Sequence, residues 1–343
     1  MNILIVKLGA IGDVIHTLPA LAAMRRAMPE AKISWAVEKR SAEILRGNTM
    51  IDDLIEVDTR KIRSENIIGK VPEIGRQLRE LKKNGFDVAI DFQGLLKSAT
   101  IAKLSGAKHR WGFSREDLRE PASRVFLTNS VRVPERTHVI SKNLLLAGEA
   151  FEASYSSENL EFLISTVEAH RDEAELIIKQ AGGSFAILNP AGGWVTKLWP
   201  AERFGRLADR IWEEHRLVPL IATGPKESDL SNAVMGASRS GKALAIQPSL
   251  KGFFELAKRA AIYVGGDTGP THLAVAAKTP IVGIFGPTEW WRNGSPDRED
   301  ICVERTDIGC RVDCHRRKCS NWICMDISAE TVLNAVNQRL TAQ

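Results

Sequence analysis

MNILIVKLGAIGD, residues 1–13, contains the pattern that decides the fold. Its apolar run Ile3–Val6 predicts a buried strand, which leads directly into a turn with Gly9 and Gly12. Glycines at such a turn let the backbone bend tightly and approach a ligand. Asp13 then opens a helix expected over Asp13–Ala27. Strand, tight turn and helix in this order predict the first unit of a Rossmann-like sheet, which binds its ligands at the carboxyl edge of the strands.

The same alternation of strand and helix continues along the chain and restarts once. Further strands are expected at Ile33–Val37, Leu54–Val57 and Val88–Asp91, and then at Phe185–Asn189, Val218–Ala222, Ile262–Val264 and Ile281–Phe285. Helices are expected at Ala201–Glu214, Phe253–Ala260 and His272–Ala277, with a last helix capped by Ser328. This alternation predicts an α/β fold with parallel sheets covered by helices.

The restart predicts two Rossmann-like domains that face each other across a cleft. The polar, helix-rich stretch 156–183 separates the two series of strands and has no strong strand of its own. We therefore expect domains over residues 1–160 and 161–343, an arrangement that allows the final helix to pack back on the N-terminal domain.

Composition limits the classes of function. The 343 residues are 44% hydrophobic and 26% charged, as in ordinary globular proteins, and no apolar run approaches the ~18 residues that span a bilayer. The N-terminus lacks the basic and apolar regions of a signal peptide, so we expect a cytoplasmic protein. A net charge of +5 suits phosphorylated substrates or an anionic membrane surface. The chain shows no nucleic-acid-binding motif, and no nucleic acid partner is expected.

VGGDTGPTH, residues 264–272, predicts an anion-binding loop. It follows a strand and opens a helix, where backbone N–H groups, the helix dipole and the hydroxyls of Thr268 and Thr271 favour a phosphate. It is not a P-loop, because Gly-Lys-Ser/Thr is missing. Asp267 is expected to fix the loop rather than touch phosphate. The alternative is an ordinary glycine-rich turn.

Two more strand ends carry polar residues. NPAGGWVTKLWP, residues 189–200, brings a glycine pair and Lys197, which suits a phosphate as a flexible point charge. TGPKE, residues 223–227, brings Glu227, whose carboxylate suits ribose hydroxyls. Each alone is as consistent with a solvated surface residue. Three strand ends of one domain that meet at one edge nevertheless predict a nucleotide diphosphate site.

Asp13 and Glu38 each admit a second interpretation. Asp13 is a suitable residue for a helix cap. Glu38 follows the second strand, where an NAD enzyme places its ribose-binding acid, but the G-x-G-x-x-G fingerprint is absent. A nicotinamide oxidoreductase and a non-catalytic binder of nucleotide sugars therefore remain as alternatives.

The cysteines crowd near the C-terminus. Cys310, Cys314, Cys319 and Cys324 have a metal-like spacing without a C-x-x-C pair, so a structural zinc site and a loop of free thiols are both possible. None of the strand-end motifs above falls within this loop, so replacement of these cysteines is expected to lower stability and leave the chemical step nearly intact.

Several motifs together resemble one family. They are ILIVKLGAIGDVIHTLPAL at residues 3–21, DFQGLLKSA at 91–99, REP at 119–121, KLWP at 197–200, GGDTGPTHLAVAA at 265–277 and FGPT at 285–288. In this order they resemble the lipopolysaccharide heptosyltransferases of glycosyltransferase family 9, the heptosyltransferase I type most closely. The resemblance implies the GT-B fold, with an acceptor-binding N-terminal domain and a nucleotide-sugar-binding C-terminal domain.

The resemblance also implies site residues. Asp13 matches the general base, and Lys197 the lysine on the donor phosphates. The donor site it implies comprises Gly192, Gly193, Lys197, Glu227, Asp267, Thr268, Gly269 and His272. The acceptor site it implies comprises Lys7, Arg60, Lys61, Arg63, Arg119 and His138.

The implied reaction is inverting and needs neither metal nor cofactor. Heptose passes from ADP-L-glycero-D-manno-heptose to Kdo-lipid A during synthesis of the lipopolysaccharide inner core. A heptosyltransferase II-like enzyme, or a relative with another acceptor or nucleotide sugar, is the alternative within the family. The acceptor implies a peripheral position on the anionic cytoplasmic face of the inner membrane.

Overall fold

The chain folds into two compact units, Met1–Ser165 and Thr166–Gln343. The computed structural model describes residues 1–58, 82–310, 314 and 316–342. The join lies five residues after the boundary expected between residues 160 and 161. Each unit contains one six-stranded sheet whose strands are all parallel. Each is described by itself below.

The first unit has the strand order β3-β2-β1-β4-β5-β6. Its strands are β1 (Asn2–Val6), β2 (Lys32–Glu38), β3 (Asp53–Val57), β4 (Val88–Asp91), β5 (His109–Phe113) and β6 (Asn129–Val131). Burial on both faces explains the apolar run of β1, because sheets of parallel strands are covered by helices on each side. The expected strands are confirmed, and the strands β5 and β6 at one end of the sheet are additional.

The helices of the first unit connect these strands. They are α1 (Ile11–Ile15), α2 (Leu18–Ala27), α5 (Leu96–Leu104) and α6 (Val139–Ala150), with the 3-10 helices η1 (Lys39–Ile44), η3 (Arg115–Asp117) and η4 (Pro121–Phe126). The single helix expected over Asp13–Ala27 is two helices. Pro19 in the first turn of α2 explains the break, since proline disfavours helix before it and suits a helix start.

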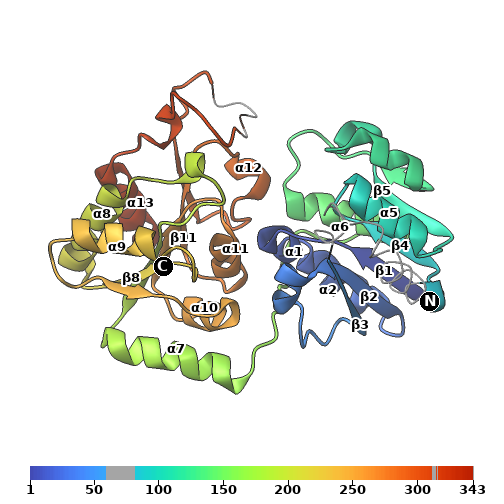
Figure 1. The fold of residues 1–343 in the computed structure, drawn as a ribbon, viewed down its shortest axis with the longest axis horizontal. Coiled ribbons are helices and arrows are strands. Elements are labelled where there is room, and N and C mark those ends of the chain that lie inside the picture. Colours follow the sequence, from blue (N-terminus) through green and yellow to red (C-terminus); the bar gives the residue numbers. More distant parts are fainter. Residues whose placement is uncertain (59–81, 311–313, 315, 343) are drawn as a thin grey trace, which may run out of the picture. The chain divides into compact units, whose positions relative to one another are not determined.

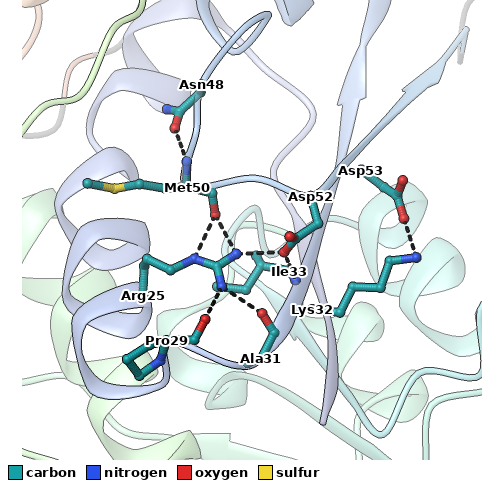
Figure 2. A network of polar contacts seen from close by, with 9 residues as sticks. All are labelled: Arg25, Pro29, Ala31, Lys32, Ile33, Asn48, Met50, Asp52 and Asp53. Atoms are coloured by element: carbon teal, nitrogen blue, oxygen red, sulfur yellow. Dashed lines mark hydrogen bonds and ion pairs between the residues drawn. The ribbon is translucent and has the colours of Figure 1, made fainter.

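Arg25 ties the end of α2 to the sheet (Figure 2). Its guanidinium donates to the carbonyls of Met50, Pro29 and Ala31 and lies 2.6 Å from the carboxylate of Asp52. That carboxylate also accepts the backbone N–H of Ile33 in β2. Six hydrogen bonds thus hold the segments before β2 and β3 together at the edge opposite to the ligand-binding one.

The second unit repeats the same plan. Its strands are β7 (Phe185–Asn189), β8 (Val218–Ala222), β9 (Leu244–Ile246), β10 (Ile262–Gly265), β11 (Ile281–Phe285) and β12 (Ile301–Glu304), in the order β12-β11-β10-β7-β8-β9. When β7 is counted as the first strand and β12 as the sixth, the order is 6-5-4-1-2-3. This is the order of the first unit, 3-2-1-4-5-6, given from the opposite edge of the sheet. The repeated order confirms two Rossmann-like domains.

Two groups of helices cover this second sheet (Figure 1). One group is α8 (Ala201–His215), α9 (Ser228–Ala237) and α13 (Ala329–Thr341), and the other is α7 (Glu168–Ala181), α10 (Leu250–Ala257) and α11 (Gly269–Ala276). The short helices are α12 (Trp290–Asn293), η5 (Val195–Lys197) and η6 (Ile323–Met325). The final helix α13 packs on α8, β11 and β12 of its own unit.

The core of the second unit forms where the first group of helices meets the sheet. Leu207 and Ile211 of α8, Val332 of α13 and Val264 of β10 are fully buried in one cluster. The helix expected over Phe253–Ala260 begins three residues earlier, because the Ser249 hydroxyl accepts the N–H of Gly252 and caps it. No helix in the described part of the chain is long and apolar enough to cross a membrane.

Candidate active site

In each sheet, the strand order places two loops side by side at the edge where Rossmann folds bind their ligands. In a Rossmann sheet the ligand site lies where neighbouring strands send their connections to opposite faces. In the first unit these strands are β1 and β4, and in the second they are β7 and β10. Asp13 follows β1, and Lys197 and Asp267 follow β7 and β10. The topology therefore brings the predicted residues to the two switch points.

Lys197 and Asp267 form a buried ion pair at the switch point of the second unit. The Lys197 Nζ lies 2.5 Å from Asp267 Oδ2 and donates to the Asp267 carbonyl at 2.9 Å. The indole of Trp194 covers the ammonium at 4.0 Å from the ring centroid. Lys197 and Asp267 are 9% and 8% exposed. The lysine thus stands as a fixed positive charge at the strand edge.

Asp267 is held as a carboxylate by its neighbours. Burial alone would raise its pKa, but the hydrogen bond from His272 and the charge of Lys197 outweigh burial and hold the pKa well below its ordinary value. His272 Nε2 lies 3.3 Å from Asp267 Oδ1, and Asn293 Nδ2 donates to Oδ2 at 3.1 Å. Asp267 thus fixes Lys197, His272 and Asn293, and its expected distance from phosphate remains a prediction.

The first turn of α11 completes the anion-binding geometry. Thr268 is the N-cap of this helix, and Gly269 is its first residue. Pro270 has no N–H, so the orphan donors of the first turn come from Gly269 and Thr271. The Thr271 hydroxyl contacts the Gly266 carbonyl and lies 2.9 Å from the Tyr263 hydroxyl, which fixes the loop from below. A diphosphate beside Lys197 would meet these N–H groups.

Glu227 and the glycine pair border the same edge. Glu227 is the N-cap of α9, and its Oε2 accepts the N–H of Gly224 at 2.8 Å. Gly192 is partly buried and Gly193 exposed, just ahead of the 3-10 turn that carries Lys197. The strands β10, β7 and β8 are neighbours in the sheet, so the three predicted loops all emerge along one edge.

Asp13 lies at the switch point of the first unit, in the first turn of α1. Its Oδ2 accepts the N–H of Ala10 at 3.0 Å, so the carboxylate does cap this turn. The same oxygen lies 3.4 Å from Nε2 of Gln93, which follows β4. Gly9 in the turn has a φ of 144°, and a Cβ there would lie 2.8 Å from the Ser41 hydroxyl, so the turn requires glycine.

Lys7 is buried and bound to main chain. Its Nζ donates to the carbonyl of Phe92 at 2.8 Å, and the residue is 4% exposed. Asp91 beside it is fully buried, and burial raises its pKa to about 6 despite hydrogen bonds from Ser98, Gln93 and Gly94. The structure gives Lys7 a bracing contact, and its predicted contact with the acceptor remains a prediction.

The other acceptor residues are spread along the first unit. His138 caps α6, where Nδ1 accepts the N–H of Ile140, and its ring lies edge-on to His16 at 6.1 Å. His16 ends α1, so this pair stands close to the helix that carries Asp13. Arg119 is exposed between η3 and η4. Arg60, Lys61 and Arg63 lie outside the described residues.

Glu38 is already neutralised by two cations. Its carboxylate lies 2.6 Å from Lys97 Nζ and 2.7 Å from Arg40 Nε, and the residue is buried. A ribose-binding acid must present its oxygens to hydroxyls. The geometry therefore disfavours the nicotinamide alternative.

The cysteine-rich segment contacts the turn that carries Lys197. Cys310, Cys314, Cys319 and Cys324 line one pocket together with Thr196 and Trp322. The Trp322 indole donates to the Thr196 carbonyl at 2.9 Å, and the Thr196 hydroxyl donates to the Arg316 carbonyl at 2.6 Å. Because Thr196 is next to Lys197, the cysteine-rich segment lies beside the turn that carries the predicted donor residue Lys197.

The four thiols do not form a metal site in the described part of the chain. Within residues 1–58, 82–310, 314 and 316–342, no group of three or more His, Cys, Asp or Glu side chains is arranged to hold an ion. The cysteines are free. The structural zinc site remains a prediction that the geometry does not support.

Four residues near the predicted site residues were not predicted from the sequence. Gln93 and His16 lie around Asp13, and Trp194 and Asn293 lie around Lys197 and Asp267. Gln93 belongs to the motif DFQGLLKSA, and Trp194 directly follows the glycine pair, so both could have been identified from their places in the sequence. Asn293 carried none, since it approaches from the separate helix α12.

Comparison with known proteins identifies the family and the fold of the chain. The model of "Glycosyltransferase family 9 (heptosyltransferase)" matches residues 74–323. The lipopolysaccharide heptosyltransferase 1 of Pseudomonas aeruginosa is 30% identical over 93% of this chain and 88% of its own length. The solved Escherichia coli heptosyltransferase WaaC with ADP aligns with a TM-score of 0.78 at 23% identity, covering 99% of this chain and 100% of that one. A family 9 glycosyl transferase from Veillonella parvula aligns with a TM-score of 0.84 at 22% identity, covering 100% and 98%. The chain therefore belongs to glycosyltransferase family 9, and it is a glycosyltransferase with the GT-B fold of two Rossmann-like domains.

Proposed function

We propose that this enzyme transfers heptose from ADP-L-glycero-D-manno-heptose to Kdo-lipid A, with inversion and without a metal, as a heptosyltransferase I-like enzyme. The observation that carries the proposal is the buried Lys197–Asp267 pair beside the first turn of α11. It supplies a fixed cation and backbone donors where a diphosphate binds. The 30% identity to a lipopolysaccharide heptosyltransferase 1 supports the choice of sugar and acceptor.

Donor binding belongs to the second unit in this proposal. Lys197 and the N–H groups of Gly269 and Thr271 bind the diphosphate, and Glu227 binds the adenosine ribose. Charge grows on the leaving diphosphate as the bond to the sugar breaks, so donors that are already in place stabilise the transition state. A positive side chain here serves where other transferases use a divalent cation. The solved relative that contains ADP supports an adenine nucleotide as donor.

Acceptor activation belongs to the first unit. Asp13 takes the proton of the acceptor hydroxyl as its oxygen attacks the anomeric carbon from the face opposite to the diphosphate. The new bond from oxygen to carbon forms while the bond from carbon to the phosphate oxygen breaks, and ADP leaves with the electron pair. Attack from the opposite face inverts the configuration, and positive charge develops on the sugar ring, as in other glycosyl transfers.

The acceptor supplies the reason for the basic residues of the first unit. Kdo and lipid A carry carboxylates and phosphates, which suit His138, Arg119, Lys7 and the cluster of Arg60, Lys61 and Arg63. A lipid acceptor also implies a peripheral place on the cytoplasmic face of the inner membrane, where anionic lipid attracts basic segments.

Turnover by the purified protein tests the proposal. ADP-heptose and Kdo-lipid A are supplied, with GDP- and UDP-linked sugars as control donors and heptosylated Kdo-lipid A as control acceptor. We expect turnover with the first pair alone and no loss of rate in EDTA. Preference for the heptosylated acceptor would instead identify a heptosyltransferase II-like enzyme, and strict dependence on Mg²⁺ would contradict the metal-free mechanism.

A further inference from the structure

Gln93 lies between the turn after β1 and the Asp13 carboxylate. It belongs to DFQGLLKSA, residues 91–99, a motif to which the proposed reaction assigns no role. Its Oε1 accepts the N–H of Leu8 at 3.1 Å and that of Gly9 at 3.3 Å. Its Nε2 points to Asp13 Oδ2 at 3.4 Å. One amide thus joins the loop after β4 to the loop after β1.

The orientation of this amide is determined by its partners. Two backbone N–H groups point at one end of the side chain, so that end must be the oxygen. A flipped amide would set its own N–H groups against those of Leu8 and Gly9. The NH₂ end is therefore directed at Asp13, where it donates to a carboxylate oxygen.

Gln93 is itself held by a buried carboxylate. Asp91 Oδ1 accepts the N–H groups of Gln93 and Gly94 at 2.9 and 3.1 Å, and Oδ2 accepts the Ser98 hydroxyl at 2.9 Å. Lys7 fixes the carbonyl of Phe92 at 2.8 Å. The loop 91–94 is therefore rigid before any substrate binds, and it places the Gln93 side chain in one position.

We infer that Gln93 is a positioning residue for the acceptor base. It orients the Asp13 carboxylate, and this role rests on the proposed function of Asp13. The contacts of the carboxylate among the described residues fall on Oδ2, from Ala10 and Gln93. Oδ1 is then the oxygen directed to the acceptor hydroxyl. Contacts on one oxygen fix the rotation of the carboxylate and select the other oxygen as the one that accepts the proton.

Gln93→Glu tests this role with almost no change of shape. The substitution keeps an oxygen for Leu8 and Gly9 but replaces the donor to Asp13 by a second carboxylate oxygen. Like charges disfavour the ionised form, so the acidic limb of the kcat profile should move to higher pH by about one unit. At pH 7 kcat should fall by about 10- to 100-fold, the usual effect of a lost hydrogen bond to a charged group. Gln93→Met removes the amide without adding charge and should shift the limb less.

Asn143→Ala is the matched control. This buried amide of α6 donates to the carbonyl of His16 at 3.0 Å and to the Thr17 hydroxyl at 3.1 Å. It therefore braces the end of α1, the helix that carries Asp13, without touching the Asp13 carboxylate. We expect a lower melting temperature and an acidic limb at the wild-type pH. ADP affinity, measured by calorimetry, should be unchanged in all these variants.

The Asp13→Asn background separates positioning from general support of the fold. Once the base is absent, Gln93→Glu should cost no further activity, because residues that act as a unit are not additive. A loss of kcat without any shift of the acidic limb, or an equal loss in the Asp13→Asn background, would overturn the inference and leave the role of Asp13 standing. Near wild-type turnover by Asp13→Asn alone would instead overturn the proposed base, and the positioning role with it.

Discussion

Replacement of Lys197 by methionine should slow the reaction far more than it weakens ADP binding. Methionine keeps much of the length of the chain and removes the charge. An ammonium about 4 Å from a phosphate oxygen, at an effective dielectric constant of about 20, contributes about 4 kcal/mol. That energy corresponds to about 10³-fold in kcat/KM.

The affinity for ADP should fall less than kcat/KM does, because Lys197 is already paired with Asp267. Its Nζ lies 2.5 Å from Asp267 Oδ2, so a bound diphosphate would share the charge with this carboxylate. We expect ADP affinity to fall by about tenfold, since only the interaction gained beyond the resting ion pair is lost. The negative charge that grows on the diphosphate during transfer has no such competitor. Its lost interaction with Lys197 accounts for the rest of the decrease in kcat/KM.

Stability must be controlled in this experiment. Lys197→Met leaves Asp267 buried with only His272 and Asn293 as partners, and a buried charge left without its counter-ion costs about 3–5 kcal/mol. Lys197→Met with Asp267→Asn removes both charges and should melt closer to the wild-type temperature while remaining inactive. Calorimetry gives the dissociation constant of ADP, and release of ADP from ADP-heptose gives kcat/KM. Equal factors in both quantities would refute the transition-state role of Lys197.

Three further changes test other parts of the site. Asp13→Asn should lower kcat by about 10²–10⁴-fold, the range for a lost general base, with unchanged ADP affinity by calorimetry; normal turnover would reduce Asp13 to a helix cap. The raised pKa of Asp91, about 6, means that its contribution to stability is present below its ordinary value near 3.8 and lost as pH rises through about 6. Asp91→Asn should abolish that part of the pH dependence of the melting temperature, and an unchanged slope would exclude Asp91 as its source. Trp322→Phe keeps a ring but removes the N–H donated to Thr196, and should raise the donor KM several-fold and leave the acceptor KM alone; equal changes in both would argue for a general loss of folding. Zinc analysis of protein purified without chelator tests the predicted metal at the cysteine-rich segment, which a content near zero would contradict.

The sequence predicts the fold well because the central strands carry a strong signal. Strands buried on both faces read as continuous apolar runs, and β1, β7 and β8 match them residue for residue or nearly so. Strands β5, β6, β9 and β12 lie toward the ends of the two sheets and were not expected; β6 and β9 have three residues each, and β5 carries polar residues such as the exposed His109. Helix ends depend on local caps and prolines, which explains the break in the first helix at Pro19.

The site was predicted in part, for a similar reason. Lys197, Asp267 and Asp13 follow strands, and in a parallel sheet a residue that follows a strand is brought to the ligand edge whatever its partners are. Partners that come from elsewhere in the chain cannot be found this way. Asn293 reaches Asp267 from α12, and Trp322 reaches the Lys197 turn across more than a hundred residues of sequence. Only packing determines such contacts, and one sequence does not display it.

The two units use the same brace at their switch points. In each, a buried lysine after the first strand donates to a main-chain carbonyl in the loop after the fourth: Lys7 to Phe92 at 2.8 Å, and Lys197 to Asp267 at 2.9 Å. A parallel sheet opens at this point because neighbouring connections leave to opposite faces, so a long cationic side chain is well placed to bridge the gap. The two lysines differ in what else they contact. Lys7 is next to a carboxylate, Asp91, that accepts three hydrogen bonds from its own loop, whereas the Asp267 carboxylate contacts Lys197 directly. A ligand phosphate can share the cation in the second case, while in the first the lysine serves to hold the loop that carries Gln93. We therefore expect Lys7→Met to lower the melting temperature and kcat together, whereas a selective rise of the acceptor KM would support the predicted contact of Lys7 with the acceptor.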